Sequence, residues 1–404
     1  MTKKSDAPAI RFKGFSDAWE QRKAKELFVS TADKGYPELP VLSATQDRGM
    51  IRRDENSINI FHDKKNEAGY KRVLPGQFVI HLRSFQGGFA HSAIEGITSP
   101  AYTVFGFSEP EKHDSEYWKY VFTSKSFIRR LETVTYGIRD GRSISYDEFL
   151  TLGFVYPSKA EQTAIARYLD KLSDLITLHQ RKFEKLTNVK KSMLEKMFPQ
   201  NGSSYPEIRF KGFTDPWEQR KAIDIADYSK GNGYSKGDLT DAGTPIILYG
   251  RLYTKYQFAI NEVDTFAVPR NGAVYSQGNE VIVPASGETA EDIARASAVE
   301  KSGVLLGGDL NILRPFDFIN PLFLALAISN GEPQKELAKK AQGKSVVHIH
   351  NSDIQEVTIA YPSRTEQDRI VSYFSQLDNL ITLHQRELEK LQNIKKSMLE
   401  KMFV

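Results

Sequence analysis

The chain has no cysteine among its 404 residues, which excludes disulfides, thiol nucleophiles and thiolate-bound metal ions. It also has no hydrophobic run near the ~18 residues of a membrane-spanning helix, and no apolar stretch follows its basic start, MTKKSDAPAIRF. We therefore expect a cytoplasmic protein. Neither sign of charge dominates, because 55 Lys and Arg against 51 Asp and Glu leave a net charge of +4. That small excess permits binding to a polyanion without requiring it.

What the sequence does have is an internal repeat. Residues 10–24, IRFKGFSDAWEQRKA, recur at 208–222 as IRFKGFTDPWEQRKA, identical at 13 of 15 positions. A longer segment at 156–198 recurs at 361–403, identical at 28 of 43 positions. We call these four segments the frame. The stretches they enclose, 25–155 and 223–360, share no comparable similarity, and we call them the first and second inserts. The chain is therefore a tandem duplication with alike frames and unlike inserts.

The longer frame segments predict two long helices. Each begins with a Tyr-Pro pair and an S-x-x-E capping box, Ser158 to Glu161 and Ser363 to Glu366, in which the serine accepts a backbone bond and the glutamate reaches back. No Gly or Pro follows until Pro199 in the first copy, so each helix can run for roughly 39 residues, about 58 Å.

Apolar residues along these helices recur at alternating spacings of three and four, which is typical of a coiled-coil seam. The seam residues are Ile176, Phe183, Leu186, Met193 and Met197 in the first helix and Ile381, Leu388, Leu391, Met398 and Met402 in the second. The same positions include His179 and His384, which we interpret as packing residues, and Lys190 and Lys395, whose ammonium groups we expect to be exposed. Two seams of equal register favour an intramolecular helix pair over two separately buried helices.

Both inserts read as mixed α+β domains. Short β-branched and aromatic runs bounded by Gly, Pro or Asn predict strands at 77–82, 102–107, 244–249, 280–284 and 311–315, and helical patterns occur at 115–130 and 320–340. The predicted order is a first domain at 1–157, a long helix at 158–198, a Pro/Gly/Ser-rich linker at 199–207, a second domain at 208–362 and a long helix at 363–404.

No catalytic or metal-binding motif is complete. Gly343-Lys344-Ser345 lacks the earlier glycine of a phosphate-binding loop, the glycine-rich stretch at 231–237 has Lys236 where a dinucleotide loop needs glycine, and NPLF at 320–323 lacks the second proline of an amino-methyltransferase loop. His348 and His350 have no acidic ligand at a motif-like spacing. We predict no catalytic residue, no metal and no cofactor.

Basic, aromatic and amide residues in glycine-containing loops remain as candidates for contacts with DNA. Arginine can bind phosphate or guanine, and glutamine can bind adenine. The candidates are Arg52, Arg53, Arg83, Ser84, Gln86, Tyr136, Arg139, Arg142 and Ser143 in the first insert, and Lys230, Tyr234, Lys236, Arg251, Tyr253, Lys255, Tyr256, Arg270, Lys344 and Ser345 in the second. Each cluster taken alone could be an ordinary solvated surface.

The whole arrangement resembles the specificity subunit (HsdS) of type I restriction-modification systems. The resemblance is carried by WEQRK at 19–23 and 217–221, by the Tyr-Pro-Ser-x-x-Glu-Gln entry into each long helix, and within the inserts by segments 83–88, 99–102 and 307–311. It implies two target-recognition domains, each reading half of a split double-stranded DNA sequence, joined by an antiparallel coiled-coil spacer with pseudo-twofold repetition.

The resemblance also implies partners. Two methyltransferase (modification) subunits would dock on the helices, and restriction (motor endonuclease) subunits would join through the complex, so that catalysis belongs to those partners and the chain itself is not an enzyme. Two other functions stay open at this point. They are a free-standing bivalent DNA-binding regulator and a coiled-coil scaffold that binds only protein.

Overall fold

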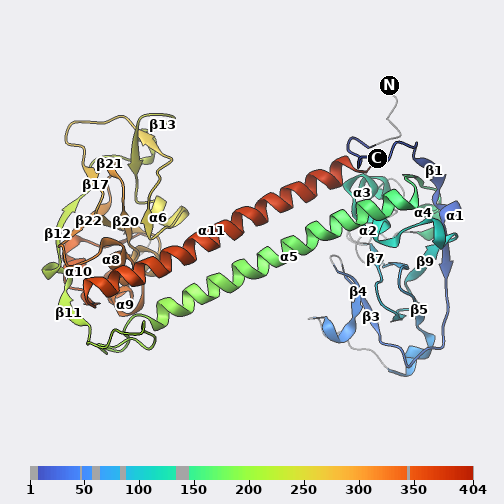
Figure 1. Cartoon of the computed structure of the whole chain (residues 1–404), viewed down its shortest axis with the longest axis horizontal. Helices are drawn as coiled ribbons and strands as arrows, with labels where there is room; N and C mark the ends of the chain where they lie inside the picture. The colour runs from blue at the N-terminus through green and yellow to red at the C-terminus, as the bar shows by residue number, and fades with distance from the viewer. Residues whose placement is uncertain are drawn as a thin grey trace. The chain divides into compact units, whose positions relative to one another are not determined.

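The computed structural model of the chain describes residues 8–45, 48–56, 64–81, 88–132, 145–343 and 346–403 (Figure 1). It contains two compact units, one made of residues 1–180 and 386–404 and the other of residues 181–385. Both long helices contribute to both units. The first, α5, spans Lys159–Lys196, and the second, α11, spans Arg364–Lys401. The expected helices at 158–198 and 363–404 therefore lie within two residues of these bounds, except at the end of α11.

The frame forms the same structure in each unit. In the first, β1 (Glu20–Lys23) pairs antiparallel with β10 (Gly153–Tyr156), and the Tyr156 hydroxyl donates to Glu20 at 2.9 Å. In the second, β11 (Glu218–Lys221) pairs antiparallel with β24 (Thr358–Tyr361). There the Tyr361 hydroxyl donates to Glu218 at 3.0 Å. In each unit, a two-stranded ladder thus holds the first and last residues of the insert close together, directly before the long helix.

A buried ion pair ties the first turn of each long helix to the short frame segment. Arg11 donates two hydrogen bonds to Glu161, at 2.7 and 2.9 Å, and the Glu161 side chain is 2% exposed. Arg209 and Glu366 form the same bidentate pair, at 2.7 Å for both bonds. The capping-box prediction for these glutamates is therefore wrong, since both carboxylate oxygens accept from arginine instead of reaching back to the helix start.

The first insert is a mixed domain around an aromatic core. Phe28, Phe78, Phe89, Phe105 and Phe122 are all buried, and their ring centroids lie 4.9–6.0 Å apart in the contacting pairs. The core lies on a four-stranded sheet of order β2-β9-β6-β7. The helices and strands of the first insert are α1 (Ala24–Leu27), β2 (Phe28–Thr31), β3 (Leu42–Thr45), β4 (Gly49–Arg52), β5 (Lys71–Val73), β6 (Phe78–Ile80), β7 (Phe89–His91), β8 (Gly96–Thr98), β9 (Thr103–Phe107), α2 (Ser115–Thr123), α3 (Lys125–Glu132) and α4 (Tyr146–Phe149).

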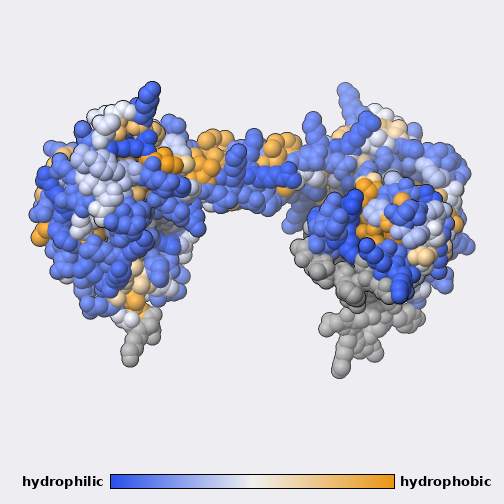
Figure 2. All heavy atoms as spheres, turned by 90° about the horizontal axis from the view of Figure 1, so that it is seen from below, coloured by the Kyte–Doolittle hydropathy of each residue, from blue (hydrophilic) through white to orange (hydrophobic). Residues whose placement is uncertain are grey.

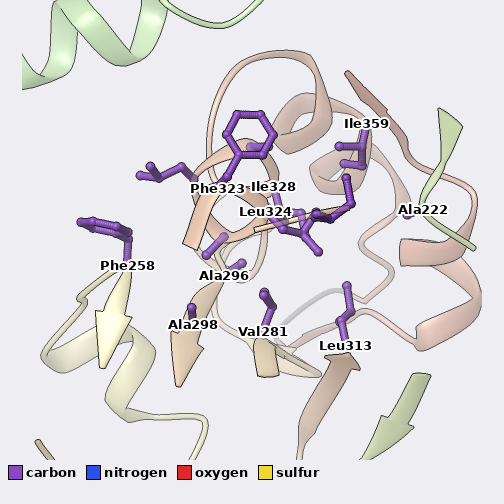
Figure 3. Close-up of a cluster of buried hydrophobic side chains, with 14 of the residues drawn as sticks. Ala222, Phe258, Val281, Ala296, Ala298, Leu313, Phe323, Leu324, Ile328 and Ile359 are labelled. Atoms are coloured by element: carbon purple, nitrogen blue, oxygen red, sulfur yellow. The ribbon is translucent and has the colours of Figure 1, made fainter. Parts of the chain in front are cut away.

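The second insert contains two five-stranded sheets, of order β12-β22-β18-β20-β15 and β13-β16-β14-β21-β17. Figure 3 shows Val281, Ala298 and Leu313 of the first sheet facing Phe323 and Leu324 of helix α8. The elements are β12 (Ala226–Lys230), β13 (Leu239–Thr240), β14 (Thr244–Ile247), α6 (Arg251–Thr254), β15 (Ala259–Ile260), β16 (Phe266–Ala267), β17 (Tyr275–Gln277), β18 (Glu280–Pro284), β19 (Ser286–Gly287), α7 (Ala290–Ile293), β20 (Ser297–Val299), β21 (Ser302–Leu306), β22 (Leu310–Pro315), α8 (Pro321–Ile328), α9 (Gly331–Lys340), β23 (Val347–His348) and α10 (Asn351–Gln355).

Strands occur at all five places where the sequence predicted them, as β6, β9, β14, β18 and β22. Both predicted insert helices are interrupted. The first breaks at Ser124, whose hydroxyl accepts from the Phe127 amide at 3.2 Å and so caps α3. The second breaks between Ile328 and Gly331, where the Ala296 amide donates to the Ser329 hydroxyl at 2.8 Å and Gly331 adopts φ +66°. Serine side chains that bond to backbone compete with helix continuation at both places.

Within each unit the long helices pack side by side in opposite directions. In the first, Ser173 of α5 contacts Lys395 of α11, and Ile176 lies with Gln392 on one cavity wall. In the second, Lys190 contacts Asp378, and Phe198, just after α5, lies 6.5 Å from Phe374 between ring centroids.

The ten predicted seam residues are buried or half-buried. Three leucines off the seam, Leu178, Leu380 and Leu383, are by contrast 46%, 44% and 52% exposed. The prediction for the seam lysines is wrong. Lys190 binds Asp378 at 2.5 Å, and the half-buried Lys395 ammonium donates to Ser173, so neither group simply projects into water.

Candidate nucleic-acid interface

Nine of the sequence-predicted contact residues lie outside the described residues. These are Arg83, Ser84, Gln86, Tyr136, Arg139, Arg142, Ser143, Lys344 and Ser345. The other ten are placed, two of them in the first insert. Arg52 ends β4 and pairs with Asp54 at 3.1 Å, and this hydrogen bond holds the pKa of the Asp54 carboxyl below its usual value. Arg53 follows, half-buried, and its Nε and Nη1 have no hydrogen-bond partner within the described part of the chain.

In the second insert, one cavity of about 910 Å³ gathers four predicted residues, Tyr234, Lys236, Arg251 and Lys255. Two loops and a short helix build it. The glycine-rich loop after β12 carries Tyr234 and Lys236, and α6 (Arg251–Thr254) contributes Arg251 and Thr254 to the lining. The remaining lining residues include Tyr249, Asp238, Asp264 and Asp309. The cavity therefore combines lysine and arginine side chains with carboxylates and an exposed tyrosine.

Arg251 is held inside the wall of this cavity. Its guanidinium donates to Asp264 at 2.5 Å and to the Glu262 carbonyl at 2.8 Å, and its side chain is 9% exposed. Lys255 donates to the same carboxylate at 2.6 Å. The two cations, Lys255 most strongly, hold the pKa of Asp264 well below its usual range. Arg251 thus fixes α6 to the loop before β16, and Lys255 is the more exposed cation of the pair.

Tyr234 and Arg270 form a second fixed group. The Tyr234 ring is buried, its hydroxyl accepts from the Arg270 amide at 2.8 Å, and the Arg270 guanidinium lies 5.2 Å from the ring centroid. Arg270 also pairs with Asp238, whose carboxylate accepts from the Ser235 amide and hydroxyl. These bonds lower the pKa of Asp238, the Ser235 amide most strongly. The loop that carries Lys236 is therefore rigidly fixed at both ends.

The hydroxyl groups of two predicted tyrosines bond to the backbone instead. The Tyr253 hydroxyl donates to the Ser286 carbonyl at 2.6 Å, and the Tyr256 hydroxyl donates to the Ala296 carbonyl at 3.3 Å. Burial raises the pKa of both phenols. Their polar atoms are engaged with backbone, so they position α6 and the following loop. Lys230 lies exposed at the end of β12, outside the residues that line the cavity.

The sequence did not single out the cavity carboxylates. Asp238 and Asp264 were missed because their role depends on arginines 32 and 13 positions away in sequence. Asp309 belongs to the segment 307–311 that carried part of the family resemblance, and Tyr249 precedes α6; both line the cavity. The glycines that precede Asp309, at 303, 307 and 308, were the visible sign of an unusual loop there.

The first unit has a polar cavity of about 750 Å³ where α2 meets the long helices. Lys119 donates to Glu116 at 2.6 Å and to Asp170 at 2.9 Å, and the Tyr120 hydroxyl donates to Asp170 at 2.7 Å. Burial lowers the pKa of His91, which lines the same cavity. The network links the insert to α5, and nothing in the sequence pattern marked it.

No group of three or more His, Asp or Glu side chains suited to a metal ion occurs in the part of the chain that the structure describes. A helix long and apolar enough to cross a lipid bilayer is likewise absent from the described residues. Hydrophilic residues cover most of the face of each unit visible in Figure 2.

The known proteins that this chain is similar to are specificity subunits of type I restriction-modification systems. The chain is 21% identical over 254 residues to the type I restriction enzyme MjaVIII specificity subunit of Methanocaldococcus jannaschii, and the match covers 60% of this chain and 59% of the relative, less than two thirds of its length. A crystal structure of the S subunit of a type I restriction-modification system from M. genitalium shares the fold, with a TM-score of 0.59, 14% identity and coverage of 98% of this chain and 99% of that one. The HsdS subunit of Thermoanaerobacter tengcongensis aligns with a TM-score of 0.48 at 14% identity, over 95% of this chain and 96% of that one.

The shared fold confirms the predicted α+β class. A family model, the type I restriction modification DNA specificity domain, matches residues 214–393. This match covers the second insert with its frame, and it agrees with DNA target recognition and does not favour a regulator or a protein-only scaffold. The resemblance drawn from the repeated motifs is thus confirmed, and residues 214–393 match the model of the type I restriction modification DNA specificity domain.

Proposed function

We propose that the chain is the DNA-recognition subunit of a type I restriction-modification complex and that its two inserts read the two halves of one asymmetric, split target. The observation that carries this is the repeated frame. The Arg11–Glu161 and Arg209–Glu366 pairs fix equivalent helix starts to equivalent short frame segments. On these matched supports the two inserts have different sheets and loops. One scaffold that presents two unlike readers fits a target with two unlike halves.

Catalysis belongs to partner subunits in this proposal. Two methyltransferase subunits would bind the two frame copies, and restriction subunits would join through them. The long helices are the shared element of both units, and in the proposal they set the separation of the two half-sites.

The test is to express the full chain with the methyltransferase encoded beside it, in a host without other adenine methylation, and to map modified adenines across the genome. The proposal expects one two-part motif with a fixed gap. Replacing the second insert (223–360) by that of a relative should change one half of the motif and leave the other half unchanged. Modification at scattered single sites, or modification that does not depend on this chain, would contradict the proposal.

A further inference from the structure

The loop 307–309, between β21 (Ser302–Leu306) and β22 (Leu310–Pro315), is held in one conformation at the cavity of the second insert. Gly231 and Gly307 pack backbone to backbone, so closely that a Cβ on Gly231 would overlap the Gly307 carbonyl. Asp309 adopts φ +58°, a left-handed conformation that few residues other than Gly, Asn and Asp accept. Its carbonyl accepts from the Ala285 amide at 2.8 Å. The Asp309 side chain therefore starts from a fixed backbone.

Asp309 also has a carboxylate that no neighbour neutralises. Of the three acidic residues lining the cavity, Asp238 is paired with Arg270, and Asp264 is paired with Arg251 and Lys255. Asp309 is exposed and has no hydrogen-bond or ion-pair partner for its side chain among the described residues. An exposed, uncompensated acceptor thus lines the same cavity as Lys236 and Lys255.

A carboxylate at a DNA-facing surface cannot bind the backbone, because phosphates carry the same charge and offer no donor. It can bind only a donor on a base edge. In the major groove, cytosine presents the N4 amino group, whereas the adenine N6 amino group lies beside the N7 acceptor, which would repel the second carboxylate oxygen. Cytosine is therefore the base that a single fixed carboxylate reads best.

We propose that Asp309 is a specificity-determining residue of the second insert and accepts a hydrogen bond from the N4 amino group of a cytosine in the second half-site. The inference rests on the proposed function, since it assumes that this insert binds double-stranded DNA. Lys236, which is also unpaired among the described residues, would bind a phosphate beside that base pair and hold the loop in register.

The experiment compares methylation motifs of complexes that carry wild-type chain, Asp309→Asn, Asp309→Gly and Asp241→Asn. Asparagine and glycine both accept the left-handed backbone, so the loop is expected to fold in each. Asparagine replaces the acceptor-only group by an amide, which pairs with adenine. Asp241 is an exposed aspartate of the same insert that does not line the cavity, and it serves as the matched control.

We expect a C·G pair at one position of the wild-type second half-site, and a change of roughly tenfold or more in base preference at that position for both Asp309 variants, toward A·T for Asp309→Asn. The first half-site and Asp241→Asn should keep the wild-type motif. An unchanged motif in either Asp309 variant overturns the inference and leaves the proposed function standing. Absence of any two-part motif with the wild-type chain would instead sink the proposed function and the inference with it.

Discussion

The Lys395 ammonium donates a 2.8 Å hydrogen bond to the Ser173 hydroxyl, joining α11 to α5 in the first unit. Lys190 occupies the same repeat position in the other frame copy, and its partner, Asp378, occupies the position of Ser173. The duplicated lysines thus face a hydroxyl in one unit and a carboxylate in the other. Burial lowers the pKa of Lys395.

This difference predicts opposite outcomes for one substitution. Lys395→Met should leave stability unchanged or raise it by up to about 1 kcal/mol, because a half-buried charge is removed and Ser173 still donates to the Leu169 carbonyl at 2.8 Å. Lys190→Met should lower stability by about 1 kcal/mol, since Asp378 loses its cation. Urea unfolding of both variants measures the difference, and equal effects would show that the two sites do not differ as described.

The buried Arg11–Glu161 pair predicts a large effect at the start of α5. Glu161→Ala should destabilise the first unit by about 3 kcal/mol, because the Arg11 charge is left in a largely buried site. Glu111 is exposed and lines a cavity together with Arg11 and Glu161, so Glu111→Ala is the control and should change stability little. Combining Arg11→Met with Glu161→Leu should recover part of the loss. Thermal unfolding of the full chain tests all three, and a tolerated Glu161→Ala would refute the role given to this pair.

His113 predicts a loss of stability in acid. Burial lowers its pKa to about 4, and its ring stacks on Phe107 with centroids 4.7 Å apart. In the unfolded chain this histidine takes up a proton near pH 6.5, whereas in the folded protein it stays neutral until about pH 4. The folded protein therefore loses stability relative to the unfolded chain as the pH falls from about 6.5 toward 4. His113→Phe should remove roughly 1–2 kcal/mol of that decrease. His348 is exposed, so His348→Gln is the control and should leave the decrease in stability unchanged. Thermal melting of both variants from pH 7 to 4.5 measures the difference.

Lys236 predicts a change in salt dependence. If its ammonium binds one phosphate, Lys236→Ala should weaken binding to all DNA sequences alike and reduce the slope of log affinity against log salt by about 1. Arg251→Lys should not reduce this slope in the same way. The Arg251 guanidinium is engaged with Asp264 and the Glu262 carbonyl, so its role is to support α6. Binding of the assembled complex to duplex DNA at several salt concentrations gives both numbers. An unaltered slope for Lys236→Ala would place its ammonium away from the backbone.

The two ends of the frame predict a tolerated circular permutation. The Ile208 amide donates to the Lys196 carbonyl at 2.9 Å, and the Ile10 amide donates to the Lys401 carbonyl at 3.1 Å. Eleven residues connect Lys196 to Ile208. If Val404 were fused to Met1, twelve residues would connect Lys401 to Ile10. A chain fused in this way and opened between Asn201 and Gly202 should fold and keep its methylation motif. An insoluble or inactive product would mean that the equivalent junctions are not interchangeable.

Much of this architecture could be read from the sequence, because the repeat is long and the helices contain no Gly or Pro over their whole length. Their bounds, and the strands such as β18 (Glu280–Pro284), follow from local patterns. What could not be read depends on partners far away in the chain. Glu161 matches a capping box, yet it binds Arg11, 150 residues earlier.

The candidate site shows the same limit. Lys236, Lys255 and Tyr234 were chosen for residue type and loop context, and the fold brings them to one cavity. Tyr253 and Tyr256 share that context, but their hydroxyls bond to carbonyls 33 and 40 residues away. Arg251 looks like a DNA-facing arginine in the sequence. Its ion pair with Asp264 shows that it is a structural residue, and the local sequence does not reveal that pair.

The final residues of the chain complete the core of its first unit. Met402 is buried among residues such as Trp118 and Leu169, and Phe403 stacks on Tyr117 with centroids 5.5 Å apart. The second unit contains α11 only as far as Gln385, and the last α11 residue buried in its core is Leu377. During synthesis, therefore, the half of the protein that leaves the ribosome first is the half that finishes folding last. Until residue 403 emerges, its aromatic core is left open on the side that α11 covers.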